Sequence, residues 1–164
     1  MSLRRVIVVM GVSGTGKSTT GRALAEALGL PFLEGDDLHP ESNVAKMAAG
    51  IPLTDADRAP WLDLIAAELD QPLVVACSAL KRTYRDRLRR AAPDLVLVYL
   101  HGDPELLLSR MSQRDGHFMP TALLDSQLAT LEEPAADEDV IPVDVMLRPD
   151  EIVEVVTDRL RQRG

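Results

Sequence analysis

The chain has 164 residues and a mass of 17.9 kDa, a length typical of one domain, and we interpret residues 1–164 as a single domain. Apolar residues make up 46% of the chain and charged residues 27%, which excludes a mainly disordered protein. The formal net charge of -8 excludes broad electrostatic attraction to nucleic acid or to an anionic membrane. An anionic ligand must therefore be held by a local basic site.

Buried strands are indicated by apolar runs at residues 6–10, 31–33, 73–77, 95–100 and 140–146, of which residues 31–33 form the weakest. Segments with helical periodicity lie between these runs. Leu24 and Leu28 share one helical face that ends before Gly29, and Ile152 and Leu160 share another. Strands that alternate with helices predict an α/β fold, a parallel sheet with helices on both faces.

Two stretches interrupt this alternation. Residues 39–69 read as a helical insert broken by Gly50, Pro52 and Pro60, and residues 110–120 read as a polar loop. Inserts of this kind in a small α/β domain often close over a ligand. We therefore expect a substrate-binding insert at residues 39–69 and a lid at residues 110–120.

The strongest motif follows the first predicted strand and opens the first predicted helix. Residues 11–18 read Gly-Val-Ser-Gly-Thr-Gly-Lys-Ser, a full match to the phosphate loop G-x-x-x-x-G-K-[ST]. Lys17 should reach the β- and γ-phosphates, and the Ser18 hydroxyl is suited to bind Mg²⁺. The alternative, a plain glycine-rich turn, does not account for the strand and helix on either side. The predicted nucleotide-binding residues are Gly11, Val12, Ser13, Gly14, Thr15, Gly16, Lys17, Ser18 and Thr19.

Missing motifs narrow the class of phosphate-loop protein. Asn43 is the only asparagine, so the guanine-binding N-K-x-D motif is absent, and no D-x-x-G switch occurs. The absence of both motifs disfavours a GTPase switch. The run at residues 73–77 ends without the aspartate that many ATPases use to hold Mg²⁺. An acidic group must therefore come from elsewhere, and the sequence Glu-Gly-Asp-Asp at residues 34–37 is the obvious source.

This acidic turn should lie beside the phosphate loop, because the carboxyl ends of parallel strands meet at one edge of the sheet. One carboxylate there could hold Mg²⁺ through water while another accepts the proton of an attacking hydroxyl. In an extended turn, Glu34 and Asp36 would face the crevice and Asp37 would face away. The alternative role for these acids is turn formation or helix capping.

Basic side chains for the phosphates could come from two further places. Lys81 and Arg85 lie nearest the end of the third long apolar run, in a segment that otherwise reads as a solvated helix face. Arg110 and Arg114 are four residues apart, so both could point toward the phosphates from one helical turn. The alternative for this pair is exposed salt bridges.

Other single residues carry weaker information. Cys77 is the only cysteine, so no intramolecular disulfide and no cysteine-based zinc site can form. No apolar run approaches the roughly 18 residues of a membrane span. We therefore expect a cytoplasmic protein without a membrane partner. Trp61 and Met47 of the insert are expected to pack in the interior and not to contact a ligand.

Beyond the phosphate loop, the chain resembles the gluconokinase family. The resemblance is carried by residues 32–40, 43–47, 50–53, 55–61, 77–81, 84–86, 116–119 and the Gln-x-x-x-Leu-Glu-x-Pro stretch at residues 127–134. It implies a phosphate-loop fold like that of nucleoside-monophosphate kinases and shikimate kinase, with a five-stranded parallel sheet. It also implies ATP-dependent phosphorylation of D-gluconate at its 6-hydroxyl, usually by a homodimer.

The resemblance also implies roles for individual residues. Asp36 would orient or deprotonate the sugar hydroxyl, and Glu34 would lie near the metal and hold it through water with Ser18. The implied catalytic residues are Lys17, Asp36, Arg110 and Arg114, the two arginines facing the transferring phosphoryl group. The implied substrate-binding residues are Asp36, Arg58 and Lys81, with His39 and Lys46 as weaker candidates.

The residues alone predict only a kinase of a small polar metabolite. Two alternatives remain: another small-metabolite kinase of the same fold, such as a shikimate or nucleotide kinase, and a non-catalytic ATP-binding module. Residues 43–61 argue against the first, and the acidic turn with the paired arginines argues against the second.

Overall fold

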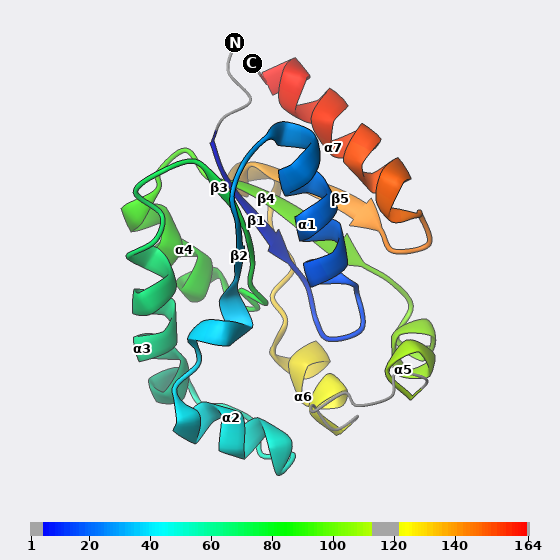
Figure 1. Cartoon of the computed structure of the whole chain (residues 1–164). Coiled ribbons are helices and arrows are strands. Elements are labelled where there is room, and N and C mark those ends of the chain that lie inside the picture. The colour runs from blue at the N-terminus through cyan, green and yellow to red at the C-terminus, as the bar shows by residue number, and fades with distance from the viewer. Residues whose placement is uncertain (1–4, 113–121, 164) are drawn as a thin grey trace.

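The computed structural model of the chain describes residues 5–112 and 122–163. Its centre is a sheet of five parallel strands, as predicted, and the strand order is β2-β3-β1-β4-β5 (Figure 1). The strands are β1 (Val6–Met10), β2 (Phe32–Glu34), β3 (Leu73–Ala76), β4 (Val96–His101) and β5 (Val140–Asp144). Because β1 lies in the middle, the loop that follows it opens at the centre of one sheet edge.

Helices cover both faces of the sheet, which confirms the predicted layers. Helices α1 (Lys17–Leu28) and α7 (Pro149–Arg163) lie together on one face, and α3 (Asp55–Ala66) and α4 (Arg82–Ala91) lie on the other (Figure 1).

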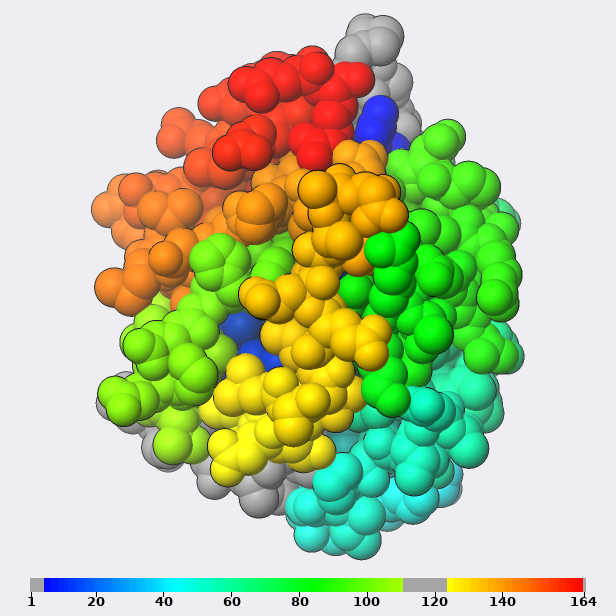
Figure 2. All heavy atoms as spheres, turned by 180° about the vertical axis from the view of Figure 1, so that it is seen from behind, coloured from blue at the N-terminus to red at the C-terminus, as the bar shows by residue number. Residues whose placement is uncertain are grey.

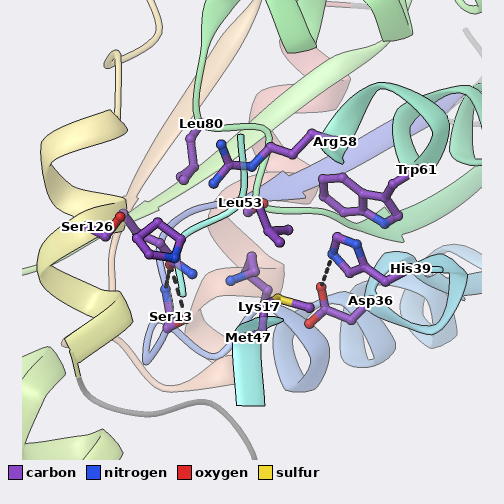
Figure 3. A pocket seen from close by; sticks show the side chains of 13 residues that line it. Ser13, Lys17, Asp36, His39, Met47, Leu53, Arg58, Trp61, Leu80 and Ser126 are labelled. Carbon is purple, nitrogen blue, oxygen red and sulfur yellow. Dashed lines mark hydrogen bonds and ion pairs between the residues drawn. The ribbon is translucent and has the colours of Figure 1, made fainter. Parts of the chain in front are cut away.

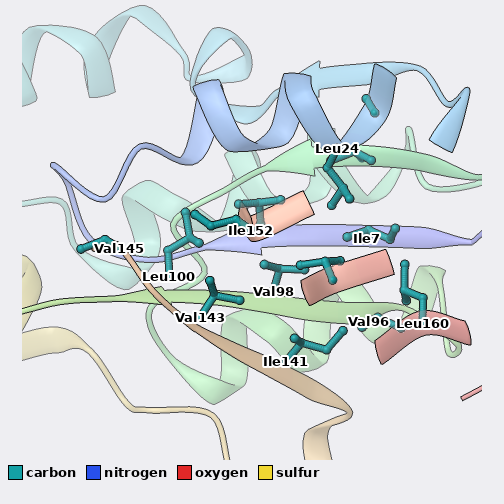
Figure 4. Close-up of a cluster of buried hydrophobic side chains, with 14 of the residues drawn as sticks. Ile7, Leu24, Val96, Val98, Leu100, Ile141, Val143, Val145, Ile152 and Leu160 are labelled. Atoms are coloured by element: carbon teal, nitrogen blue, oxygen red, sulfur yellow. The ribbon is translucent and has the colours of Figure 1, made fainter. Parts of the chain in front are cut away.

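Each face of the sheet buries its own apolar cluster. Leu24 of α1 and Ile152 of α7 pack against Ile7 of β1 in the first cluster (Figure 4). Val8, the next residue of β1, points to the opposite face and packs in the second cluster with Trp61 of α3. Burial of alternate residues on both faces explains why the central strands read as continuous apolar runs.

The predicted insert folds as two helices, α2 (Glu41–Ala48) and α3, preceded by the short 3₁₀ helix η1 (Gly35–Leu38). The chain breaks between α2 and α3, around Gly50 and Pro52, as expected. The predicted break at Pro60 is wrong, because α3 runs through it. A capping box of Thr54 and Asp57 fixes the first turn of α3, and burial of its apolar side chains stabilises the rest.

Two more helices and a 3₁₀ turn complete the described residues: α5 (Pro104–Ser112), α6 (Ala122–Thr130) and η2 (Ala136–Glu138). Arg110 lies in the last turn of α5 and not in a loop. Arg114 and the rest of the predicted lid, residues 113–120, lie outside the described residues. None of the helices within residues 5–112 and 122–163 is long and apolar enough to cross a membrane.

Candidate active site

The phosphate loop joins β1 to α1 in a conformation that requires glycine. Gly11, Gly14 and Gly16 have φ angles of 151°, 87° and 83°, which other residues rarely adopt. A Cβ on Gly11 would lie only 2.7 Å from the carbonyl oxygen of Leu100. The Lys17 Nζ donates a hydrogen bond to the carbonyl oxygen of Val12, 3.1 Å away. This contact holds the Lys17 side chain against the loop, at a helix N-terminus whose backbone N–H groups suit an anion.

The structure brings the two predicted metal-binding residues together. The Ser18 hydroxyl, at the start of α1, donates a hydrogen bond to the carboxylate of Glu34 at the end of β2. Hydroxyl and carboxylate oxygens suit Mg²⁺, which usually takes few protein ligands and completes its shell with phosphate oxygens and water. Within the described part of the chain, no group of three or more His, Cys, Asp or Glu side chains is placed to hold a metal ion.

A pocket lies between the phosphate loop and the insert (Figure 3). Lys17 reaches it from the loop, Asp36 from η1, and Arg58 from α3. The full lining is Ser13, Lys17, Asp36, His39, Met47, Pro52, Leu53, Arg58, Trp61, Ser78, Leu80, Ser126 and Gln127. Trp61 and Met47 are buried, as expected of packing residues, and they also form part of the pocket wall.

The acidic turn has a different backbone from the one predicted. Residues 35–38 form a 3₁₀ helix, so the alternation expected of an extended turn does not apply. Asp36 nevertheless lines the pocket, while Asp37 is exposed. The Trp61 Nε1 donates a 2.7 Å hydrogen bond to the carbonyl oxygen of Gly35 and so fixes the position of the turn against α3.

Arg58 is the cation that the insert places in the pocket. It is only 8% exposed, and its Nη1 donates a 3.0 Å hydrogen bond to the hydroxyl of Tyr84 on α4. Tyr84 in turn donates to Asp55. Among the residues that the structure describes, no carboxylate forms a salt bridge with Arg58. A ligand carboxylate is the natural partner for such a buried guanidinium.

Three other predicted basic residues lie outside this pocket. The Lys81 Nζ pairs with Asp55 at 3.0 Å, and hydrogen bonds from Tyr84 and then Lys81 lower the pKa of the Asp55 carboxyl. The Lys46 Nζ lies 2.9 Å from both carboxylate oxygens of its partner on α3. Arg85 is fully buried under the turn that follows β3 and does not reach the crevice. Of the predicted substrate-binding residues, Asp36, His39 and Arg58 line the pocket.

Gln127 of α6, which was not among the predicted site residues, contacts the phosphate loop. Its Oε1 accepts hydrogen bonds from the backbone N–H of Ser13 at 2.7 Å and from the Ser13 hydroxyl at 3.1 Å. These are donor groups of the segment that should receive the phosphates. The two residues are 114 positions apart, so only the Gln-x-x-x-Leu-Glu-x-Pro stretch could have drawn attention to this side chain.

A second cleft lies on the other side of the phosphate loop. It is lined by Gly14, Thr15, Gly16, Thr19, Thr20, Arg110, Val145, Leu147, Pro149 and Ile152. The Arg110 Nη2 donates a 2.9 Å hydrogen bond to the carbonyl oxygen of Val145, so this arginine faces the cleft. Seen from behind, blue atoms from early in the chain are visible in a hollow between α5 and α6 (Figure 2).

The last strand is shorter than predicted, and the turn that follows it forms one wall of the second cleft. The strand was expected to reach residue 146, but β5 ends at Asp144. The chain turns there, because the N–H of Met146 donates to the Asp144 side chain and the N–H of Leu147 donates to its carbonyl oxygen. This turn places Val145, Leu147 and Pro149 beside the phosphate loop, where an apolar wall suits the base of a nucleotide.

A parallel sheet of this order, a phosphate loop after its central strand and an acid in the facing pocket define a phosphate-loop kinase with a small acceptor. The model of the shikimate kinase family matches residues 13–161. A gluconokinase of Gluconobacter oxydans (strain 621H) is 52% identical over an alignment that covers 92% of this chain and 88% of that protein. The chain belongs to the gluconokinase family, as the sequence motifs predicted.

Comparison with solved structures agrees with this family. The crystal structure of a gluconokinase from Sinorhizobium meliloti 1021 matches with a TM-score of 0.91 and 52% identity, covering 99% of this chain and 94% of that chain. A shikimate kinase from Bacteroides thetaiotaomicron matches with a TM-score of 0.67 and 18% identity, covering 96% of this chain and 98% of that one. The second match shows the fold alone, and it confirms the predicted likeness to shikimate kinase.

Proposed function

We propose that this protein transfers the γ-phosphoryl group of ATP to the 6-hydroxyl of D-gluconate and releases 6-phospho-D-gluconate and ADP. The observation that carries this proposal is the shared pocket of Lys17 and Asp36. A group that holds the donor phosphates and a group that can accept a hydroxyl proton face the same space. The named function of the relative from Gluconobacter oxydans, at 52% identity, supports gluconate as the acceptor.

The charge distribution of the pocket suits a sugar acid. Arg58 offers a buried guanidinium on the wall formed by α3, and Asp36 offers a carboxylate on η1. A linear molecule with a carboxylate at one end and a primary hydroxyl at the other can contact Arg58 with the first and Asp36 with the second. A neutral sugar would leave the Arg58 charge without a partner, at a cost in affinity.

The reaction follows from these positions. As the 6-hydroxyl oxygen forms its bond to the γ-phosphorus, its proton passes to the Asp36 carboxylate and the bond to the β,γ-bridging oxygen breaks, leaving ADP. Lys17 stabilises the negative charge that develops on the phosphate oxygens. Ser18 and Glu34 would hold Mg²⁺, directly or through water, and the ion would supply charge neutralisation to the β- and γ-phosphates. Arg110 and Arg114 would also neutralise part of the charge on the phosphate oxygens.

The test is an initial-rate assay of ADP release with Mg-ATP and one acceptor at a time. The panel contains gluconate, glucose, shikimate, a nucleoside monophosphate and no acceptor. We expect rapid release with gluconate, and at most slow release with glucose, which has the primary hydroxyl but no carboxylate. Faster turnover of shikimate or of the nucleoside monophosphate would instead support another kinase of this fold. ATP binding without turnover of any acceptor would support a non-catalytic module.

The state in which the protein works is also part of the proposal. We propose a homodimer in the cytoplasm, on the basis of the family resemblance and of a single, buried Cys77 thiol that requires no oxidising compartment. Sedimentation equilibrium at assay concentrations tests the assembly. A purely monomeric species with full activity would contradict the dimer and leave the reaction unaffected.

A further inference from the structure

Asn43, the only asparagine of the chain, is buried behind the pocket, where it is 2% exposed. Its Nδ2 lies 2.9 Å from the carbonyl oxygen of Asp57 and 3.1 Å from the Nδ1 of His39. A carbonyl oxygen only accepts, so the amide nitrogen and not the amide oxygen must face Asp57. The same nitrogen only donates, and the Nδ1 of His39 therefore accepts.

This contact determines where His39 carries its proton. A neutral imidazole has one N–H, and because Nδ1 accepts a hydrogen bond, the hydrogen must sit on Nε2. The Nε2 faces the pocket and lies 3.9 Å from the Oδ1 of Asp36 (Figure 3). His39 therefore directs an N–H donor at the carboxylate that should accept the substrate proton.

The ring has little freedom to leave this position. Its side chain is 3% exposed, and it is stacked on Trp61 with 4.1 Å between ring centroids and 15° between planes. Trp61 is itself held to the carbonyl oxygen of Gly35, the residue before Asp36. The ring and the acidic turn are thus fixed to the same tryptophan.

The surroundings keep His39 neutral. Burial, with a smaller effect of the nearby Arg58 guanidinium, lowers the pKa of His39 to about 4. The Asp36 carboxylate acts in the opposite direction but does not offset burial. The groups that face the ring are Asp36 on η1, Asn43 on α2, and Arg58 and Trp61 on α3. At neutral pH the ring is a dipolar N–H donor and adds no positive charge beside the general base.

We propose that Asn43 holds His39 in its Nε2–H tautomer, and that His39 orients the Asp36 carboxylate toward the acceptor hydroxyl. The inference rests on the proposed function and adds two positioning residues to it. The distance of 3.9 Å between Nε2 and Oδ1 is too long for a hydrogen bond, so the inference requires the two atoms to approach when the acceptor binds. Hydrogen bonds of this kind often shorten only when the substrate is bound. One carboxylate oxygen is then held by His39 and the other is left to face the hydroxyl.

Two substitutions at His39 separate orientation from packing. His39→Phe keeps an aromatic ring against Trp61 but removes the donor, and His39→Gln keeps an N–H donor near the position of Nε2. We expect His39→Phe to lower kcat by about 10–100-fold, because a misplaced catalytic group costs up to roughly that factor, with little change in the KM for ATP or gluconate. His39→Gln should recover most of that loss. Equal kcat for wild type and His39→Phe would overturn the inference, as would an effect confined to the KM for gluconate.

The tautomer can be measured without any substrate. In ¹⁵N-labelled protein, two-bond correlations from the ring carbon protons should show His39 with a protonated Nε2 and an unprotonated Nδ1 at neutral pH, and the loss of these signals in His39→Gln assigns them. In Asn43→Asp, a carboxylate faces Nδ1, and a proton should appear there. A wild-type Nδ1–H tautomer, or an unchanged pattern in Asn43→Asp, would contradict the role of Asn43. If the acceptor panel fails but the tautomer is as stated, the proposed reaction is wrong and the placement of the proton still holds.

Discussion

Arg85 and Glu138 form a buried bidentate ion pair although they lie 53 positions apart. The Arg85 Nε and Nη2 donate to the two carboxylate oxygens at 2.7 and 3.1 Å. The Arg85 Nη1 also donates to the carbonyl oxygen of Ala79, at 2.9 Å. Ala79 has a φ angle of 45°, unusual for a residue with a side chain, and its neighbours Ser78 and Leu80 line the pocket. The ion pair therefore supports a strained turn in the pocket wall.

Removing the charge of Glu138 should destabilise the fold. Glu138→Gln keeps the shape of the side chain but leaves the Arg85 guanidinium buried without a counter-charge, a change that typically costs about 3–5 kcal/mol. Urea denaturation should report this loss in the free energy of unfolding. The control is Asp137→Asn, which removes an exposed partner of Arg82 and should cost only a small fraction as much. Equal losses in the two variants would mean that the buried pair contributes no more to the free energy of unfolding than an exposed one.

The same pair predicts how stability changes with pH. Burial by itself raises the pKa of the Glu138 carboxyl, but hydrogen bonds from Arg85 and Arg89 and from the Ala135 amide outweigh it and lower the pKa from 4.5 to about 2. A lowered pKa in the folded state means that the carboxylate stabilises the fold fully above about pH 4.5 and progressively less as the pH falls toward 2. The difference in unfolding free energy between wild type and Glu138→Gln should therefore shrink below pH 4.5. A difference that grew with acidification would contradict the assigned charge state.

Lys17 should be required for phosphoryl transfer and not for folding. Lys17→Ala removes the charge proposed to face the β- and γ-phosphates, and we expect the turnover number to fall on the order of 10³-fold, with an unchanged circular dichroism spectrum. Arg161→Ala, which removes an exposed cation of α7, serves as the matched control and should retain activity. Near-normal turnover by Lys17→Ala would exclude the phosphate loop as the site of transfer.

The three acids around η1 should differ sharply in effect. A general base contributes typically 10²–10⁴-fold, so Asp36→Asn should lower kcat by about that factor while ATP binding survives. Glu34→Gln should impair activity in a manner that high Mg²⁺ partly restores, because Glu34 faces Ser18. Asp37→Asn should have little effect, since its side chain is exposed. A crippled Asp37→Asn beside a mild Asp36→Asn would reverse the assignment.

How much could be predicted from the sequence depends on how local the signal is. The central strand and the phosphate loop could be predicted because the apolar run of β1 is followed directly by the glycines of the loop, which adopt positive φ. The resemblance implied that Lys81, and more weakly Lys46, lie near the substrate; the structure pairs each with an aspartate of α3, and these pairings have no local sequence signal. Pro60 was expected to break the helical insert, and tertiary packing of α3 outweighed this local preference.

The remaining features depend on residues far apart in the chain. Gln127 contacts Ser13 across 114 positions, and Arg85 meets Glu138 across 53. Neither contact leaves a periodic or compositional trace. The proton position of His39 likewise follows only from the orientation of the Asn43 amide, which is fixed by a carbonyl oxygen on another helix. Such contacts need coordinates before chemistry can be assigned to them.

The most direct measurement of the proposed reaction is the proton-coupled ³¹P NMR spectrum of the product formed from Mg-ATP and D-gluconate. Phosphate on the 6-oxygen is attached to a carbon that bears two hydrogens, so we predict one new phosphomonoester signal split into a triplet, in equal amount with ADP. A doublet would place the phosphate on a secondary hydroxyl, and inorganic phosphate alone would show hydrolysis without transfer. Either of these two spectra would contradict the assignment of this protein as a gluconate 6-kinase.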